Sequence, residues 1–180
     1  MNLFRKLTIG DYPADVKQNI VIMGKNTWLL IPNKYRGLSS RINIIISNTL
    51  TIEEIHDQNS THAQTYLVKS LQDAMRLINS WVNTEKDEKT KIDKSSVGDV
   101  FICGGSRLYD ECMQFDMIDT IYLTKIQEDY KCDNFIWALW EWPNSSGRTT
   151  YRKTILSTLE VTDNIDKKRV VLDIIKYDKL

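Results

Sequence analysis

Short apolar runs alternate with amphipathic segments along most of the chain. The runs predict strands at 20–23, 43–47, 65–68, 100–103 and 120–126. The segments between and before them predict helices at 2–8, at 25–31, from Ser70 onward, and at 107–113. The helix after Ser70 carries an apolar stripe, and Asp73 lies three residues beyond Ser70, close to a capping box. The stripe consists of Leu71, Ala74, Met75, Ile78 and Val82.

The C-terminal part has a different pattern. Two β-rich runs, 154–161 and 169–177, flank Asp163-Asn164 and predict an antiparallel hairpin. Residues 84–95 alternate in charge and predict a solvated loop. Strands that alternate with helices and then end in a hairpin favour an α/β fold. The expected architecture is a mixed, mostly parallel twisted sheet with helices on both faces and a C-terminal antiparallel hairpin.

Composition narrows the possible settings. A chain of 180 residues suits a single domain, and 24 basic residues balance 24 acidic ones, so no net charge draws it to nucleic acid or to a membrane surface. No apolar stretch reaches membrane-spanning length, and the N-terminus lacks the apolar core of a signal peptide. Cys103, Cys112 and Cys132 are odd in number and form no C-x-x-C pair, which disfavours a zinc site and favours reduced thiols in a cytosolic protein.

Two strand-glycine-helix turns carry the candidate chemistry. The first contains Gly24, Lys25 and Thr27, and the second contains Gly104-Gly105 followed by Ser106. Backbone N–H groups at a helix start, with a cation and a hydroxyl beside them, favour phosphate binding. Two such turns in one small domain indicate a dinucleotide lying across the ends of a sheet.

Seven ordered segments extend this pattern over the whole chain. They are Phe4-Arg5-x-x-Thr8, 17–28 (KQNIVIMGKNTW), Ile31-Pro32, Leu38-x-x-Arg41-Ile42-Asn43, Ser47, 101–109 (FICGGSRLY) and 121–124 (IYLT). In order and spacing these segments resemble the dihydrofolate reductase family. The resemblance implies one dihydrofolate reductase domain over 1–180. It also implies a monomer that uses NADPH to reduce 7,8-dihydrofolate to tetrahydrofolate, binds antifolates, and requires neither nucleic acid nor a membrane.

The resemblance also implies the cofactor contacts. Gly24, Lys25, Asn26 and Thr27 correspond to the family's binding positions for the pyrophosphate and 2′-phosphate, and Ser47 and Asn48 to those for the adenosine 2′-phosphate. Relatives often carry a basic residue at the positions of Asn26 and Asn48. Lys69 corresponds to a position beside the adenine. The remaining implied contacts are Gly104 and Gly105, which form a cis peptide in the family, and Ser106, Arg107, Leu108 and Tyr109.

For the substrate, the resemblance assigns Arg41 to the α-carboxylate of the folate glutamate, a bidentate task that lysine cannot copy. Arg5 is expected to assist it. The implied wall around the pterin and benzoyl rings consists of Phe4, Ile31, Leu38 and Cys103.

The family's catalytic carboxylate has no counterpart in this chain. Counting back from Phe4 and Thr8 places it one residue before Met1, and residues 2–10 contain no Asp or Glu. Thr124, which corresponds to the hydrogen-bonding companion of that acid, is present. The family's first central strand and its nicotinamide-covering loop are likewise expected to be absent.

Three interpretations remain open at this stage. The chain is an N-terminally incomplete copy of a working reductase, which would be inactive as written, or a catalytically silent NADPH- or folate-binding protein. A pyrimidine reductase of the riboflavin pathway shares the fold. Arg41 and the Met23-Gly24-Lys25 run argue against that third interpretation.

Overall fold

The computed structural model describes residues 2–11, 13, 16–83, 92, 94–137, 150–163 and 167–180. Most of the predicted loop at 84–95, and Asn164 of the predicted turn, lie outside the described residues. The chain divides into two compact units, Met1–Leu108 and Tyr109–Leu180. The prediction of a single domain stays a prediction.

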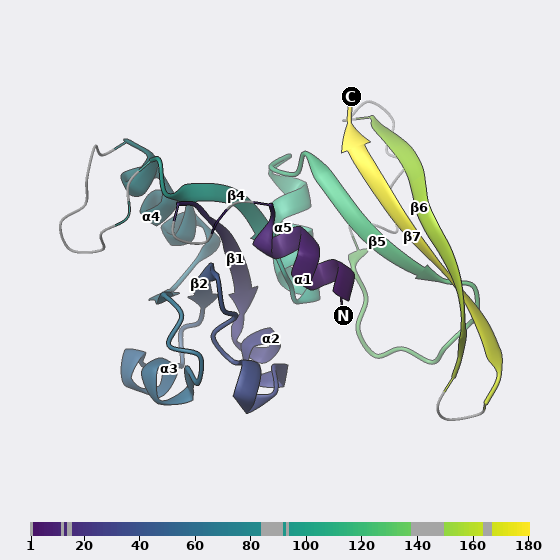
Figure 1. Ribbon diagram of the computed structural model, residues 1–180, viewed down its shortest axis with the longest axis horizontal. Coiled ribbons are helices and arrows are strands. Elements are labelled where there is room, and N and C mark those ends of the chain that lie inside the picture. The colour runs from purple at the N-terminus through teal and green to yellow at the C-terminus, as the bar shows by residue number, and fades with distance from the viewer. Residues whose placement is uncertain are drawn as a thin grey trace. The chain divides into compact units, whose positions relative to one another are not determined.

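The first unit is built on a parallel sheet. Its elements are α1 (Asn2–Ile9), β1 (Gln18–Gly24), α2 (Lys25–Leu30), the 3-10 turn η1 (Asn33–Tyr35), β2 (Arg41–Ile46), α3 (Ile52–Gln58), β3 (Thr65–Val68), α4 (Leu71–Asn83) and β4 (Val97–Ile102). The strands pair in the order β3-β2-β1-β4, so β1 lies between β2 and β4 (Figure 1). The chain leaves β1 toward one neighbour and later returns on its other side, which makes the β1–β4 boundary a topological switch point.

The boundary between the units falls inside α5 (Ser106–Gln114). The second unit contains β5 (Thr120–Ile126), β6 (Tyr151–Thr162) and β7 (Arg169–Lys179), an antiparallel sheet in the order β5-β7-β6. The predicted hairpin and the mixed α/β class are confirmed. The antiparallel strands nevertheless form a sheet of their own, because β5 pairs with β7, and in the described part of the chain β4 pairs with β1 alone.

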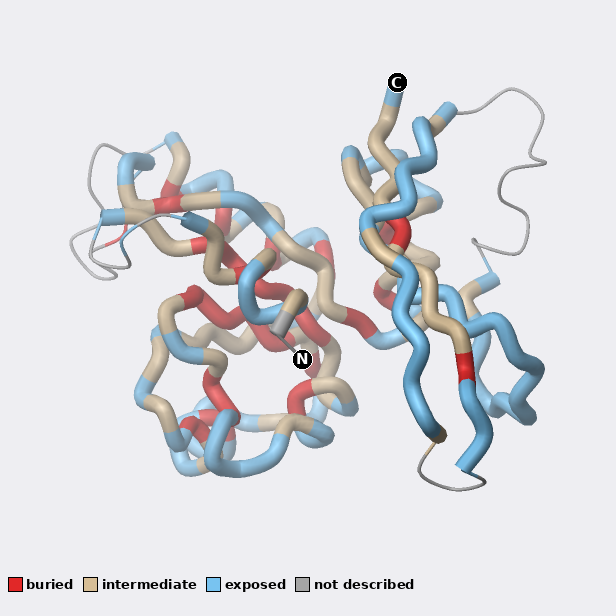
Figure 2. The backbone as a smooth tube through the Cα atoms, turned by 45° about the vertical axis from the view of Figure 1, so that its right-hand side comes forward, coloured by how far each residue is buried: buried red, intermediate tan, exposed pale blue. Residues whose placement is uncertain are grey.

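Buried apolar side chains from several elements hold the first unit together. Val21, Met23, Trp28, Ile45 and Ile55 form one cluster in which every member is completely buried. Figure 2 shows most of the buried residues in this unit. Burying a side chain of this size stabilises the fold by about 1.5–3 kcal/mol. Because these residues come from β1, α2, β2 and α3, the cluster ties the first glycine turn to the sheet.

The buried face of helix α4 differs in part from the predicted apolar stripe. Its buried residues are Leu71, Ala74, Ile78 and Trp81, which follow the helical spacing i, i+3, i+7 and i+10. Met75 and Val82, both expected in the core, are only half-buried. The large indole of Trp81 packs at a tilt of 56° against the ring of Tyr66 of β3, with ring centroids 5.1 Å apart, and is completely buried in the core.

Sequence reasoning missed helix α3. It begins after Thr51, whose Oγ1 accepts a hydrogen bond from the Glu54 backbone N–H at 3.2 Å, while the Glu54 carboxylate accepts from the Thr51 N–H at 2.7 Å. This reciprocal capping box stabilises a helix of seven residues with a single buried side chain, Ile55. The motif T-x-x-E was visible in the sequence and predicts this helix start.

Candidate functional site

All four parallel strands end at the same edge of the sheet. The register pairs Gly24 with Ile46 and Ile46 with Val68, so Lys25, Ser47 and Lys69 each follow a strand end there. The Ser47 N–H donates to the Val68 carbonyl at 2.9 Å, which keeps the two loop starts adjacent. The carboxyl edge of a parallel sheet is where ligands bind in open α/β folds.

The two glycine turns are in direct contact. The Gly24 N–H donates to the Gly104 carbonyl at 2.8 Å, and the Cys103 N–H donates to the Ile22 carbonyl at 2.8 Å. A methyl group added at Gly105 would lie 3.7 Å from Thr27 Oγ1. The Gly104-Gly105 peptide is cis, as the family resemblance implies. The structure therefore brings together the two turns that the sequence predicted to share one dinucleotide.

A network of side-chain donors lies beside the first turn. Lys25 Nζ donates to Thr49 Oγ1 at 2.7 Å, and the Thr49 and Leu50 N–H groups donate to Ser47 Oγ at 3.1 and 3.0 Å. Ser47 is buried, whereas Asn26 and Asn48 are exposed and do not join this network. Sequence reasoning missed Thr49, because a threonine in a loop carries no signal of its own.

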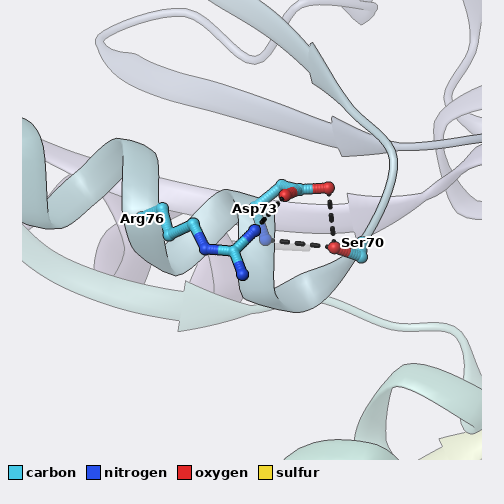
Figure 3. Close-up of polar contacts among 3 residues, drawn as sticks. All are labelled: Ser70, Asp73 and Arg76. Atoms are coloured by element: carbon cyan, nitrogen blue, oxygen red, sulfur yellow. Dashed lines mark hydrogen bonds and ion pairs between the residues drawn. The ribbon is translucent and has the colours of Figure 1, made fainter.

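Lys69 occupies the loop between β3 and α4, where it is exposed. The next residue, Ser70, precedes α4 and caps it: Asp73 N–H donates to Ser70 Oγ at 3.1 Å, and the Ser70 hydroxyl donates to the Asp73 carboxylate at 2.7 Å (Figure 3). Arg76 pairs with the same carboxylate at 2.9 Å. The predicted capping box is thus only half formed. Ser70 Oγ accepts from the Asp73 N–H, but the Asp73 carboxylate accepts from the Ser70 hydroxyl and not from the Ser70 N–H.

Arg41 is a buried cation at the start of β2. It is 4% exposed, its Nη1 donates to Thr8 Oγ1 at 2.7 Å, and its Nε donates to the Ser39 carbonyl at 3.1 Å. Burial lowers the pKa of Arg41, the Cys103 thiol acts in the opposite direction, and the charge of Arg5 lowers the pKa further. Among the described residues no carboxylate forms an ion pair with it. A buried guanidinium held by neutral acceptors is suited to bind an external anion.

Most of the apolar residues predicted to surround the substrate rings pack against the buried cluster of the first unit. Ile31, Leu38 and Cys103 are partly buried and pack against the cluster that contains Trp28. Phe4 of α1 is 46% exposed and does not belong to this cluster, and Arg5 is exposed as well. Three of the four predicted wall residues therefore share one packed region.

The three thiols differ in environment. Burial raises the pKa of Cys103 to about 12 and that of Cys112 to about 11, whereas Cys132 is exposed.

Because only the thiolate reacts, an aromatic disulfide reagent at pH 8 should modify Cys132 quickly and should modify Cys103 and Cys112 only in denaturant. A Cys132→Ser variant should lose the fast phase. Rapid reaction of two thiols in the folded protein would contradict this assignment.

The remaining predicted residues continue along the second turn and beyond. Ser106, Arg107 and Leu108 form the first turn of α5, where Leu108 is buried and its N–H donates to the Gly105 carbonyl at 3.0 Å. Tyr109 and Thr124 belong to the second unit, and Thr124 is exposed in the middle of β5. The roles of both residues stay predictions.

A polar cavity of about 360 Å³ lies at the amino end of β3, away from the predicted site. Its lining contains both histidines of the chain but none of the predicted site residues. Among the described residues, no group of three or more histidine, cysteine or acidic side chains is arranged to hold a metal ion. No helix within the described ranges is long and apolar enough to cross a bilayer.

Comparison with known proteins decides the family. The family model for dihydrofolate reductase matches residues 1–154. The chain belongs to the dihydrofolate reductase family. The match includes both glycine turns, Arg41 and Thr124, and ends within β6.

Individual relatives agree with this assignment. A viral dihydrofolate reductase of Saimiriine herpesvirus 2 is 34% identical over 157 residues, which cover 83% of this chain and 66% of the relative. Dihydrofolate reductase of Gallus gallus is 34% identical over 132 residues, 73% of this chain and 60% of the relative. The bifunctional dihydrofolate reductase-thymidylate synthase of Plasmodium berghei is 38% identical over 117 residues, 64% of this chain and 18% of the relative. The chain thus spans less than two thirds of the length of these relatives.

Proposed function

We propose that this chain binds NADPH and 7,8-dihydrofolate at the carboxyl edge of the parallel sheet and supports reduction to 5,6,7,8-tetrahydrofolate. The observation that carries the proposal is the contact between the two glycine turns, where the Gly24 N–H meets the Gly104 carbonyl. Family membership supports dihydrofolate reduction in general. The proposed setting is a monomer in a reducing cytosol, since the chain's three cysteines are free thiols.

The residues present are chemically suited to the phosphorylated cofactor. Lys25 and the Ser47 hydroxyl offer a cationic and a neutral donor, as a 2′-phosphate requires, and Thr49 joins them in one hydrogen-bonded network. When bound, the reduced nicotinamide supplies the hydride. We assign the rest of the cofactor surface to Gly24, Asn26, Thr27, Asn48, Lys69, Gly104, Gly105, Ser106, Arg107, Leu108 and Tyr109.

For the substrate, Arg41 would bind the α-carboxylate of the folate glutamate, with Arg5 adding positive charge nearby. Thr8 and the Ser39 carbonyl fix the guanidinium before any ligand arrives, which reduces the entropy lost on binding. Ile31, Leu38, Cys103 and Phe4 would exclude water from the pterin and benzoyl rings. Antifolates that carry a glutamate would use the same contacts.

The described site contains no acid on α1 that could deliver the proton. Reduction adds hydride at C6 and a proton at N5, yet α1 carries no carboxylate that could hold the pterin. In the proposal Thr124 would orient such an acid or a water molecule. With the 180-residue chain, only substrate already protonated by solvent should react, so turnover should be slow and should rise about tenfold for each unit that pH falls.

The test is NADPH oxidation with dihydrofolate between pH 5 and 8, combined with measured binding of NADPH and methotrexate. Binding of both ligands with slow, proton-limited turnover supports the proposal. A rate plateau below a pKa of the enzyme would reveal an internal acid and contradict the proton argument. Binding without any turnover would favour the second candidate, a silent NADPH- and folate-binding protein, which the acid-free α1 also suits. Failure to bind either ligand would refute both.

A further inference from the structure

We propose that Thr49 is a positioning residue that fixes the Lys25 ammonium for the cofactor's 2′-phosphate and thereby sets the preference for NADPH over NADH. This inference rests on the proposed function. Its basis is the hydrogen bond of 2.7 Å from Lys25 Nζ to Thr49 Oγ1. The two residues are 24 positions apart: Lys25 is the first residue of α2, directly after β1, and Thr49 lies in the loop after β2.

The network around Thr49 contains donors from which a negatively charged ligand could accept. Ser47 Oγ already accepts from the Thr49 and Leu50 N–H groups, so its lone pairs are occupied and its hydroxyl can only donate, either to Thr49 Oγ1 or to a ligand. Thr49 Oγ1 accepts from Lys25 and lies 3.4 Å from Ser47 Oγ. No residue of the network carries a negative charge, so the ammonium is restrained by a neutral hydroxyl and keeps two protons for an anion.

The restraint matters because the residues next to Lys25 and Thr49 in sequence add no further cation. Asn26 and Asn48 flank Lys25 and Thr49 in sequence, and neither carries a charge. A lysine side chain is flexible, and much of its freedom must be lost when it grips a phosphate. Thr49 removes part of that freedom in advance, so its hydroxyl acts through Lys25 and needs no contact of its own with the phosphate.

The test is the dissociation constant for NADPH and for NADH, measured by quenching of protein fluorescence on the full 180-residue chain. Thr49→Val keeps the side-chain shape but removes the acceptor. It should weaken NADPH binding about tenfold and leave NADH binding within about twofold, because only NADPH carries the 2′-phosphate. Thr49→Ser restores the hydroxyl and should restore NADPH affinity. In a Lys25→Met background, Thr49→Val should have no further effect.

Each outcome decides a different point. If the parent chain binds NADPH and Thr49→Val binds it equally well, the positioning role is refuted while the proposed function survives. If Thr49→Val weakens NADPH and NADH equally, Thr49 only supports the loop, and the inference is again wrong. If the parent chain binds neither dinucleotide, the proposed function and this inference fail together. Thr49 is exposed, so its variants should fold, and unchanged thermal melting would verify this.

Discussion

Replacing Arg41 with methionine should weaken binding of folate and of methotrexate about a hundredfold, which corresponds to about 2.7 kcal/mol. The guanidinium is 4% exposed and meets no carboxylate among the described residues, so the proposed anion is the charge that would compensate it. Losing one member of a buried, charge-assisted pair costs about 2–5 kcal/mol of binding. Affinity for NADPH should stay the same, because Arg41 begins β2 and lies at the other end of that strand from Ser47.

Two controls separate loss of the clamp from general damage. A diaminopteridine without the glutamate should bind Arg41→Met and the parent chain equally well. The matched variant is Arg36→Met, which removes another buried guanidinium. Arg36 donates to the Leu29 and Ile31 carbonyls at 2.7 and 2.9 Å, so its loss should lower the free energy of unfolding by about 2–4 kcal/mol and leave the ratio of the two affinities unchanged. Equal losses for both ligands in Arg41→Met would contradict the clamp.

The sequence predicted the strands well, because their signal is local. Unbroken apolar runs such as Ile44–Ile46 in β2 leave little choice of element, and β3 and β5 have the predicted bounds. Helix α3 was missed because it buries a single side chain and therefore shows no apolar period. The pairing of β5 with β7 in a separate sheet was not predictable, because backbone ladders leave no trace in side-chain spacing.

In the candidate site, too, local features could be predicted from the sequence and long-range contacts could not. Glycine turns and an arginine before a strand are visible in the sequence, and the family pattern gave them meaning. Contacts between distant segments are not visible. Examples are the bond from Arg41 to Thr8, 33 residues away, and the bond from Lys25 to Thr49. Neither threonine carries a charge or belongs to a periodic pattern, so only the three-dimensional structure identifies it as a partner of the cation.

Gly37→Ala should destabilise the first unit by about 2–5 kcal/mol and lower its melting temperature by about 10 °C. Gly37 has a φ of +78°, where a side chain costs about 1–2 kcal/mol. An added methyl group would also collide with the Asn59 carboxamide and lie 2.9 Å from Thr61 Oγ1. Asn59 is buried and its amide donates to the Ala63 carbonyl at 2.7 Å and to Thr65 Oγ1 at 3.1 Å, so it has little room to move.

The measurement is urea unfolding followed by tryptophan fluorescence, since Trp28 and Trp81 are completely buried in this unit. Asn59→Ala removes the carboxamide that the methyl group would strike. The double variant Gly37→Ala/Asn59→Ala should therefore lose less stability than the sum of the two single variants. Additive losses would show that the backbone conformation alone accounts for the effect. A stability equal to that of the parent chain in Gly37→Ala would refute the left-handed conformation at Gly37. It would also mean that the loop after η1, which contains Gly37, does not pack against the loop after α3. In the structure the Thr61 hydroxyl donates to the Gly37 carbonyl and joins these two loops.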